Sequence, residues 1–411
     1  MSDLQKAWAK NRLGTMPVET FDEREEEEMG TVSELPEHFD DDSSSASSAS
    51  SASSTGTIIP SPSQNLFARP QGVPRGRTFQ PIPWTTYFER ELFLHDETLP
   101  QSPTTHAYLT SPVGKGPLFV MHHGGGSSGL SFAVVGDQIR KRLPSAGVFS
   151  LDARGHGSTT IPEGQALDLS LETLADDLLT ALRLTQREMK WAEPPPVILV
   201  GHSMGGAVVT ELARSGRLGS ALLGYAVLDV VEGSAIDALQ HMHTYLSTRP
   251  TGFQTLETGI EWHTRSRTIR NSVSARTSVP SLLTLEKNAE EEGKAEGKPA
   301  DARPWKWRTD LAATQPYWEN WFVGLSAKFL AAKGGKLLLL AGTDRLDTEL
   351  TIGQMQGKYN LQVFPEAGHF IHEDLPEKIA VSLVDFHRRN DRTALVLPPK
   401  VSDLLKQGKK V

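Results

Sequence analysis

The feature that most constrains this chain is Gly201-His202-Ser203-Met204-Gly205, which directly follows the apolar run Val197–Val200. Four consecutive apolar residues, three of them β-branched, are typical of a strand buried on both faces. A strand that turns at once into a helix strains the residue at the turn, and flanking glycines avoid clashes with it. The same pattern also occurs in turns without a catalytic role. Here strand, turn and helix follow in the order that presents Ser203 as a nucleophile.

Strand-like and helix-like segments alternate on both sides of this turn. Leu171, Leu174, Leu178 and Leu182, for example, recur at the three- and four-residue steps of one helix face. The alternation predicts an α/β class, and the serine turn narrows it to an α/β-hydrolase fold, a mostly parallel central sheet flanked by helices. The expected strands are 91–95, 105–109, 118–121, 148–152, 197–200, 222–228, 336–341 and 361–364, and the clearest helices are 169–188 and 376–388.

The two ends of the chain differ from this alternating part. Residues 1–78 combine an acidic block, a serine and alanine run and a proline-rich stretch, so we expect a disordered tail. Residues 396–411 are expected to form a loose basic tail. The hydrolase domain is expected to span 79–395, interrupted at about 230–335 by a cap or lid insertion that lacks the strand and helix rhythm of the core.

Charge and composition exclude several classes of protein. Residues 1–42 hold 13 acidic and 4 basic side chains, so the formal net charge of −8 belongs to this tail, and no basic patch indicates nucleic-acid binding. The absence of cysteine excludes a disulfide framework, a thiolate metal site and a cysteine nucleophile. No apolar run approaches the roughly 20 residues of a membrane span, and no signal-peptide core is present at the N-terminus. We therefore expect a soluble protein of the cytoplasm or nucleus.

The insertion holds five of the chain's eight tryptophans. Rigid aromatic side chains can line a substrate site, but they also commonly form the core of a cap. Both uses remain open from the sequence. A charged segment, 286–301, is expected to be a mobile loop. His241 and His243 lie two apart on an expected helix and do not share a face, so no metal site is expected there. The five tryptophans are Trp262, Trp305, Trp307, Trp318 and Trp321.

An oxyanion hole is expected from His122-His123-Gly124-Gly125-Gly126, which ends the strand at 118–121. In this fold the loop after the third strand donates one backbone N–H, beside the N–H of the residue after the nucleophile. We assign Gly125 and Met204 as these donors; a merely flexible loop is the alternative. Successive strand residues point to opposite faces, so His122 and His123 are not expected to chelate a metal as a pair.

A serine nucleophile needs a base to accept its proton, and the base needs a carboxylate to orient it. His369 follows the last strand within Ala367-Gly368-His369, where the chain order Ser, Asp, His places the base. His372 is the competing candidate. Asp152, in the loop Asp152–Ser158, is expected to brace its loop.

Spacing alone leaves three aspartates as candidates for the carboxylate that orients the base. Asp344 and Asp347 follow the strand after the insertion, which is the commonest position, and Asp229 follows the preceding strand. All lie at strand ends that approach the histidine loop in this fold.

Residues 79–390 carry a set of short motifs. They are P-I-P-W at Pro81–Trp84, H-G-G-G at His123–Gly126, G-H-S-M-G-G from Gly201, D-V-V-E-G at Asp229–Gly233, I-E-W at Ile260–Trp262, L-T-I-G-Q-M-Q-G-K at Leu350–Lys358 and G-H-x-x-H-E-D at Gly368–Asp374. Together these motifs resemble the protein phosphatase methylesterase family. The serine turn is generic to hydrolases, whereas D-V-V-E-G and L-T-I-G-Q-M-Q-G-K are specific to that family. The long acidic tail and the composition of 286–301 depart from the family, and neither touches a motif.

The resemblance implies a serine esterase that removes the methyl ester from the C-terminal leucine of the type 2A protein phosphatase catalytic subunit. It also implies that Asp229 is the acid, joining Ser203 and His369, and that no cofactor or metal is needed. That phosphatase subunit is then the expected partner, with no nucleic acid or membrane. Two alternatives are a small-molecule carboxylesterase or lipase and a non-catalytic binding protein on the same fold.

Overall fold

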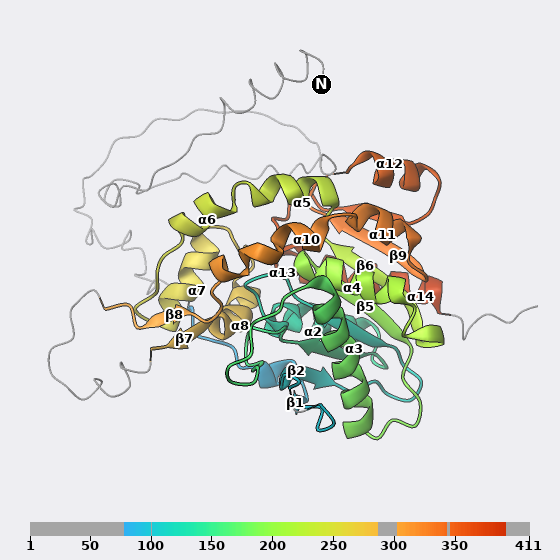
Figure 1. Ribbon diagram of the computed structural model, residues 1–411, viewed down its shortest axis with the longest axis horizontal. Helices are drawn as coiled ribbons and strands as arrows, with labels where there is room; N and C mark the ends of the chain where they lie inside the picture. The colour runs from blue at the N-terminus through green and yellow to red at the C-terminus, as the bar shows by residue number, and fades with distance from the viewer. Residues whose placement is uncertain (1–77, 100, 287–301, 343–345, 392–411) are drawn as a thin grey trace, which may run out of the picture. The chain divides into compact units, whose positions relative to one another are not determined.

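The computed structural model describes residues 78–99, 101–286, 302–342 and 346–391. The segments expected to form tails and the charged loop lie almost entirely outside these residues, as does Asp344. The described part forms an eight-stranded sheet with helices on both faces, which confirms the predicted fold class (Figure 1).

The strands of the sheet lie in the order β1-β2-β4-β3-β5-β6-β9-β10. All neighbours from β4 to β10 are parallel, while β2 is antiparallel to both β1 and β4. Every residue of β3, β5 and β6 is buried, as their continuous apolar runs predict. The strands are β1 Arg90–Leu94, β2 Thr105–Thr110, β3 Leu118–His122, β4 Gly147–Leu151, β5 Val197–His202, β6 Leu222–Leu228, β9 Gly335–Leu340 and β10 Asn360–Val363.

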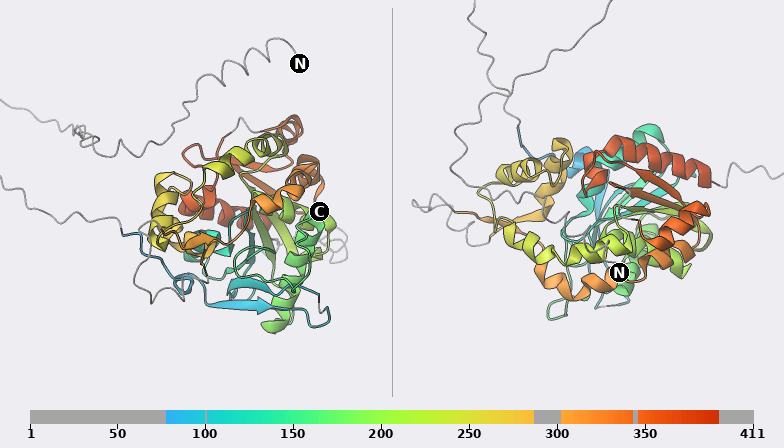
Figure 2. Two further views of the ribbon diagram at one scale, coloured as in Figure 1. Left: turned by 60° about the vertical axis from the view of Figure 1, so that its left-hand side comes forward. Right: turned by 90° about the horizontal axis from the view of Figure 1, so that it is seen from above.

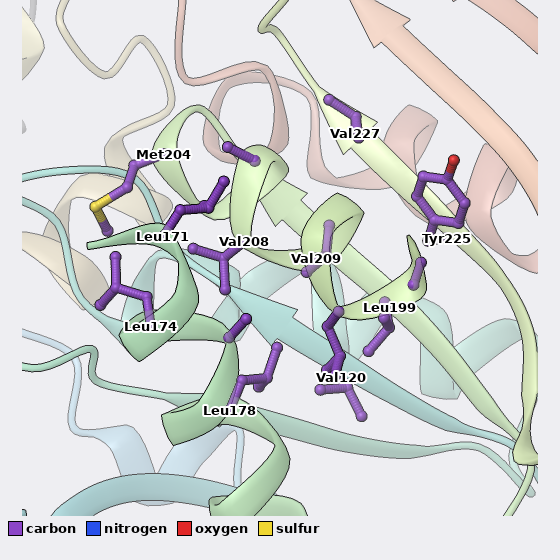
Figure 3. Close-up of a cluster of buried hydrophobic side chains, with 14 of the residues drawn as sticks. Val120, Leu171, Leu174, Leu178, Leu199, Met204, Val208, Val209, Tyr225 and Val227 are labelled. Atoms are coloured by element: carbon purple, nitrogen blue, oxygen red, sulfur yellow. The ribbon is translucent and has the colours of Figure 1, made fainter. Parts of the chain in front are cut away.

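One face of the sheet packs against α3 (Leu171–Glu188) and α4 (Met204–Ser215). Leu174 and Leu178 of α3 meet Val208 of α4 and Leu199 of β5 in a buried cluster (Figure 3). Full burial of each such side chain stabilises the fold by about 1.5–3 kcal/mol. The helix α3 begins two residues later than expected, because Ser170 accepts a hydrogen bond from the Thr173 N–H and caps it.

The other face packs against α2 (Ala133–Arg142) and α14 (Pro376–Asn390). The sequence analysis did not identify α2, whose start has no side-chain cap. Two further helices, α12 (Thr348–Met355) and the short α13 (Ile371–Asp374), flank the last strand. Among the described residues no helix has the length and apolar character that crossing a bilayer requires.

The insertion between β6 and β9 contains several short helices and a two-stranded ribbon (Figures 1 and 2), and it contacts helices on both faces of the sheet. Its two ends are joined, because the Glu232 carboxylate accepts hydrogen bonds from the N–H groups of Gly324 at 2.9 Å and Ser326 at 3.1 Å. Its elements are α5 Glu232–Leu239, α6 Met242–Thr248, α7 Leu256–Arg265, α8 Ser272–Leu282, β7 Leu283–Leu285, β8 Trp305–Trp307, α10 Trp318–Phe322 and α11 Leu325–Ala331.

Candidate active site

Ser203 occupies the sharp turn between β5 and α4, with φ 51° and ψ −121°. A non-glycine residue in this region is strained and persists only where its surroundings hold it. The surroundings here leave no alternative: a Cβ on Gly201 would lie 2.1 Å from the Gly205 carbonyl oxygen, and one on Gly205 would lie 2.1 Å from that of His122. The Ser203 N–H donates to the carbonyl of Leu228, so the turn is fixed to the neighbouring strand.

Asp229 is the first residue after that neighbouring strand, β6, and it also has a positive φ of 50°. Its N–H donates to the Leu339 carbonyl at 2.8 Å, and its Oδ1 accepts from the Ala341 N–H at 2.8 Å. Its Oδ2 lies 2.9 Å from His369 Nδ1. The carboxylate is therefore held by the adjacent strand β9 on one side and faces the imidazole on the other.

His369 lies in the loop between β10 and α13, with its side chain 45% exposed while that of Asp229 is fully buried. The Asp229 carboxylate can only accept at neutral pH, so Nδ1 carries the proton and Nε2 is left as the basic atom. The peptide units around His369 are held separately. The Gly368 N–H donates to Asp374 at 2.7 Å, and the His369 carbonyl accepts from His202 Nε2 at 2.8 Å.

The other described candidates for acid and base have different surroundings. Asp347 is the N-cap of α12, where it accepts from the Leu350 N–H at 2.9 Å and from the Ser326 hydroxyl. His372 is fully buried against the ring of Phe132, and neither of its nitrogens has a partner among the described residues. Burial lowers the pKa of His372 to about 3. A base that stays neutral and enclosed in this way is not placed to receive a proton from Ser203.

The glycine loop after β3 is braced by buried histidines. His123 Nδ1 donates to the Gly124 carbonyl at 2.7 Å, and His156 Nε2 accepts from the Gly126 N–H at 2.9 Å. Burial lowers the pKa of both imidazoles, so each stays neutral and keeps one donor and one acceptor nitrogen. Among the described residues, the N–H groups of Gly125 and Met204 have no acceptor.

Asp152 braces the next loop, as expected. Its carboxylate accepts from the Gly129 N–H at 2.8 Å, from the Ser158 N–H at 2.9 Å and from His106 Nδ1 at 2.8 Å. Both oxygens are thereby used in holding the loops around β4 and β2 together, which is a structural role.

The tryptophans of the insertion serve mainly as packing. Trp262, Trp305 and Trp307 contact the buried cluster around Phe253, and Trp318 is buried against the main core. Trp321 differs, because it also lies close to the glycine loop. A Cβ on Gly125 would be 3.8 Å from its ring and 3.5 Å from Leu311. The insertion therefore borders the site at Trp321 and Leu311.

Sequence reasoning quoted His202 and Asp374 within motifs but gave neither a role. His202 acts on the backbone of His369, 167 residues away, and Asp374 joins Gly368, six residues before it, to Arg270, 104 residues before it. Contacts over such long separations leave no local sequence signal. Over the described ranges, no group of three or more His, Asp or Glu side chains is arranged to hold a metal ion. The expectation that no cofactor is needed stays a prediction.

Comparisons with known proteins identify the fold and the family of the chain. Residues 119–381 match the alpha/beta hydrolase family. A solved structure of E-2-(acetamidomethylene)succinate hydrolase, 18% identical, superposes with a TM-score of 0.53 over 73% of this chain and 98% of that one, which shows the shared fold.

Full-length relatives are much closer in sequence. Protein phosphatase methylesterase 1 of Gibberella zeae is 71% identical over 412 residues, covering 100% of both chains. The protein of that name from Neurospora crassa is 65% identical over 100% of both chains, and the one from Bos taurus is 40% identical over 77% of this chain and 88% of its own. The chain thus belongs to the protein phosphatase methylesterase family, a group of serine esterases on the α/β-hydrolase fold.

Proposed function

We propose that this protein removes the methyl ester from the C-terminal leucine carboxylate of the type 2A protein phosphatase catalytic subunit, using Ser203, His369 and Asp229 as a catalytic triad. The observation that carries the proposal is the 2.9 Å contact between His369 Nδ1 and Asp229 Oδ2. Asp229 directly follows β6, which pairs with the strand β5 that leads into the strained Ser203 turn. The choice of substrate is supported by relatives that match this chain over their full length and are named protein phosphatase methylesterase 1.

In the first half of the reaction the Ser203 hydroxyl attacks the ester carbonyl carbon while His369 Nε2 accepts its proton. The N–H groups of Gly125 and Met204 donate to the resulting oxyanion, each contributing about 3 kcal/mol if they act as in known oxyanion holes. The tetrahedral intermediate collapses with cleavage of the bond to the methoxy oxygen. His369 returns its proton to that oxygen, and methanol leaves.

In the second half a water molecule attacks the acyl-enzyme carbonyl and gives its proton to His369. Collapse of this second intermediate breaks the bond to the Ser203 oxygen, which takes the proton back from His369, and releases the leucine carboxylic acid, which loses its proton to solvent. Asp229 stays ionised throughout, and stabilises the imidazolium that forms twice in each cycle.

We place this reaction in the cytoplasm or nucleus. The chain has no cysteine with which to form the disulfides that are common in secreted proteins, and this supports the placement.

The test is release of methyl groups from the methylated phosphatase catalytic subunit, compared between the wild-type protein and Ser203→Ala. We expect demethylation by the wild type and none by the variant, with unchanged thermal unfolding. A p-nitrophenyl ester assay run in parallel separates the alternatives. Hydrolysis of the soluble ester without demethylation would indicate a small-molecule carboxylesterase, and loss of neither activity in Ser203→Ala would refute the triad.

A further inference from the structure

His202, the residue before Ser203, is buried and reaches across to the loop that carries His369. Its Nε2 lies 2.8 Å from the His369 carbonyl oxygen, 167 residues away in the chain. A carbonyl oxygen only accepts hydrogen bonds, so His202 must be the tautomer that carries its proton on Nε2. Its Nδ1 has no partner among the described residues.

The ring of His202 is enclosed on its other sides. Ring centroids lie 4.6 Å away at His369, 5.1 Å away at Phe370 and 4.5 Å away at His372. A Cβ on Gly124 would be 2.9 Å from His202 Nδ1, so the glycine loop also closes against this ring. The imidazole therefore contacts both the base loop and the loop assigned to the oxyanion hole, and it cannot shift without displacing one of them.

We infer that His202 is a positioning residue for His369. Its Nε2–H binds the His369 carbonyl and ties that loop to the turn that carries Ser203, and so sets the distance between His369 and Ser203. This role rests on the proposed triad function. The Asp229 contact fixes the ring of His369 at Nδ1 but leaves the backbone of its loop free to translate. The bond from His202 removes that freedom at the carbonyl, as Asp374 does at the preceding N–H.

The charge state of His202 suits this role. The charged and titratable groups that face it are His369 from its loop, His372 from α13 and Asp229 from the end of β6. Burial, and then the two histidines, lower its pKa well below the usual value. His202 stays neutral when His369 becomes an imidazolium, so the hydrogen bond persists through the catalytic cycle and two adjacent positive charges never coexist.

Three substitutions test the hydrogen bond separately from the packing. In His202→Gln the amide N–H₂ reaches about as far as Nε2, whereas in His202→Asn it reaches only the position of Nδ1, and His202→Phe fills the volume without a donor. A misplacement of the base of about 1 Å costs on the order of 10²-fold in rate. We expect this loss in kcat for Asn and Phe with KM unchanged on p-nitrophenyl acetate, and recovery to within about tenfold of wild type for Gln.

The assay uses the full chain, with kcat given per folded enzyme from thermal unfolding of each sample. His372→Phe is the matched control, because it changes the neighbouring ring without touching the hydrogen bond, and it should keep its kcat. Wild-type kcat in folded His202→Asn or His202→Phe would overturn the positioning role, as would equal losses in Gln and Asn. Turnover that survives Ser203→Ala would instead overturn the triad itself, so the two failures are distinguishable.

Discussion

Asp374 accepts a hydrogen bond from the backbone N–H of Gly368 at 2.7 Å, immediately before His369. Its other oxygen accepts from the N–H of Arg270 at 2.8 Å, in the insertion between α7 and α8. The Arg270 guanidinium also donates to the Glu366 carbonyl in the same loop as His369. One buried carboxylate thus links the insertion directly to the candidate base.

Asp374→Asn tests this link. The amide places an N–H₂ donor against a backbone N–H, and a buried donor left without its acceptor costs about 1–3 kcal/mol of stability. We expect a lower thermal unfolding temperature and a kcat for p-nitrophenyl acetate reduced about tenfold, less than the 10²-fold of a full 1 Å displacement. Asp385→Asn is the control, because Asp385 is partly exposed and, among the described residues, pairs with the exposed Arg388. Equal effects in the two variants would show that Asp374 has no special role.

The acid of the triad is tested by comparing Asp229→Asn with Asp347→Asn. Asparagine at 229 favours the wrong His369 tautomer, so kcat should fall by about 10⁴ while the fold is kept. Asparagine at 347 still caps α12, and its kcat should stay near wild type. Asp344→Asn, the other aspartate left open by the sequence, belongs in the same series. If Asp344→Asn lost more activity than Asp229→Asn in steady-state assays, the assignment would be wrong.

The turn at Ser203 is tested by Gly201→Ala and Gly216→Ala. A methyl group at 201 would lie 2.1 Å from the Gly205 carbonyl oxygen, so the turn must distort and ester hydrolysis should be lost. Gly216 also has a special conformation, with φ 68° at the end of α4, but open space around its Cβ position. Alanine there should cost about 1 kcal/mol in denaturant unfolding with activity retained. Active Gly201→Ala enzyme would contradict the proposed strain.

The stability of the protein at acid pH is tested with His372→Phe. Burial lowers the pKa of His372 to about 3 from its ordinary 6.5, so between these pH values the unfolded chain binds a proton that the folded chain does not. The stability contributed by neutral His372 is thus present above pH 6.5 and is lost as pH falls, by about 1.4 kcal/mol per pH unit.

Phenylalanine fills the same space beside Phe132 and carries no proton. The variant should therefore gain stability relative to wild type, by a margin that grows from pH 6.5 down to pH 4, as measured by urea unfolding. Taking the difference at each pH removes the contribution of other buried histidines such as His122 and His263. A margin independent of pH would contradict the burial of a neutral imidazole at this position.

The sheet could be predicted from the sequence because the strands β3, β5 and β6 are buried on both faces and therefore form continuous apolar runs. The strained serine turn could also be located from the sequence, because close backbone contacts require its flanking glycines. Asp229 and Asp347 could not be separated by spacing, because both follow strands. Only their contacts differ: one faces His369, and the other caps a helix.

Other parts could not be predicted from local patterns alone. Helix α2 begins without a capping side chain, and the insertion is built from short helices that depend on packing for stability even where Thr255 and Asn271 cap α7 and α8. His202 binds the carbonyl of His369 and Asp374 binds the N–H of Arg270, and both peptide groups come close only in the folded chain. A pattern along the sequence cannot show which carbonyl a buried imidazole reaches.

The two hydrogen bonds of Glu232 have a consequence for the position of Asp229. The insertion begins directly after Asp229 and ends at β9, and the Glu232 carboxylate joins its two ends by hydrogen bonds. The position of Asp229, the proposed acid, is therefore set by β6, β9 and this closure rather than by the helices in between. The candidate base is different, because Arg270 of the insertion reaches its loop through Asp374.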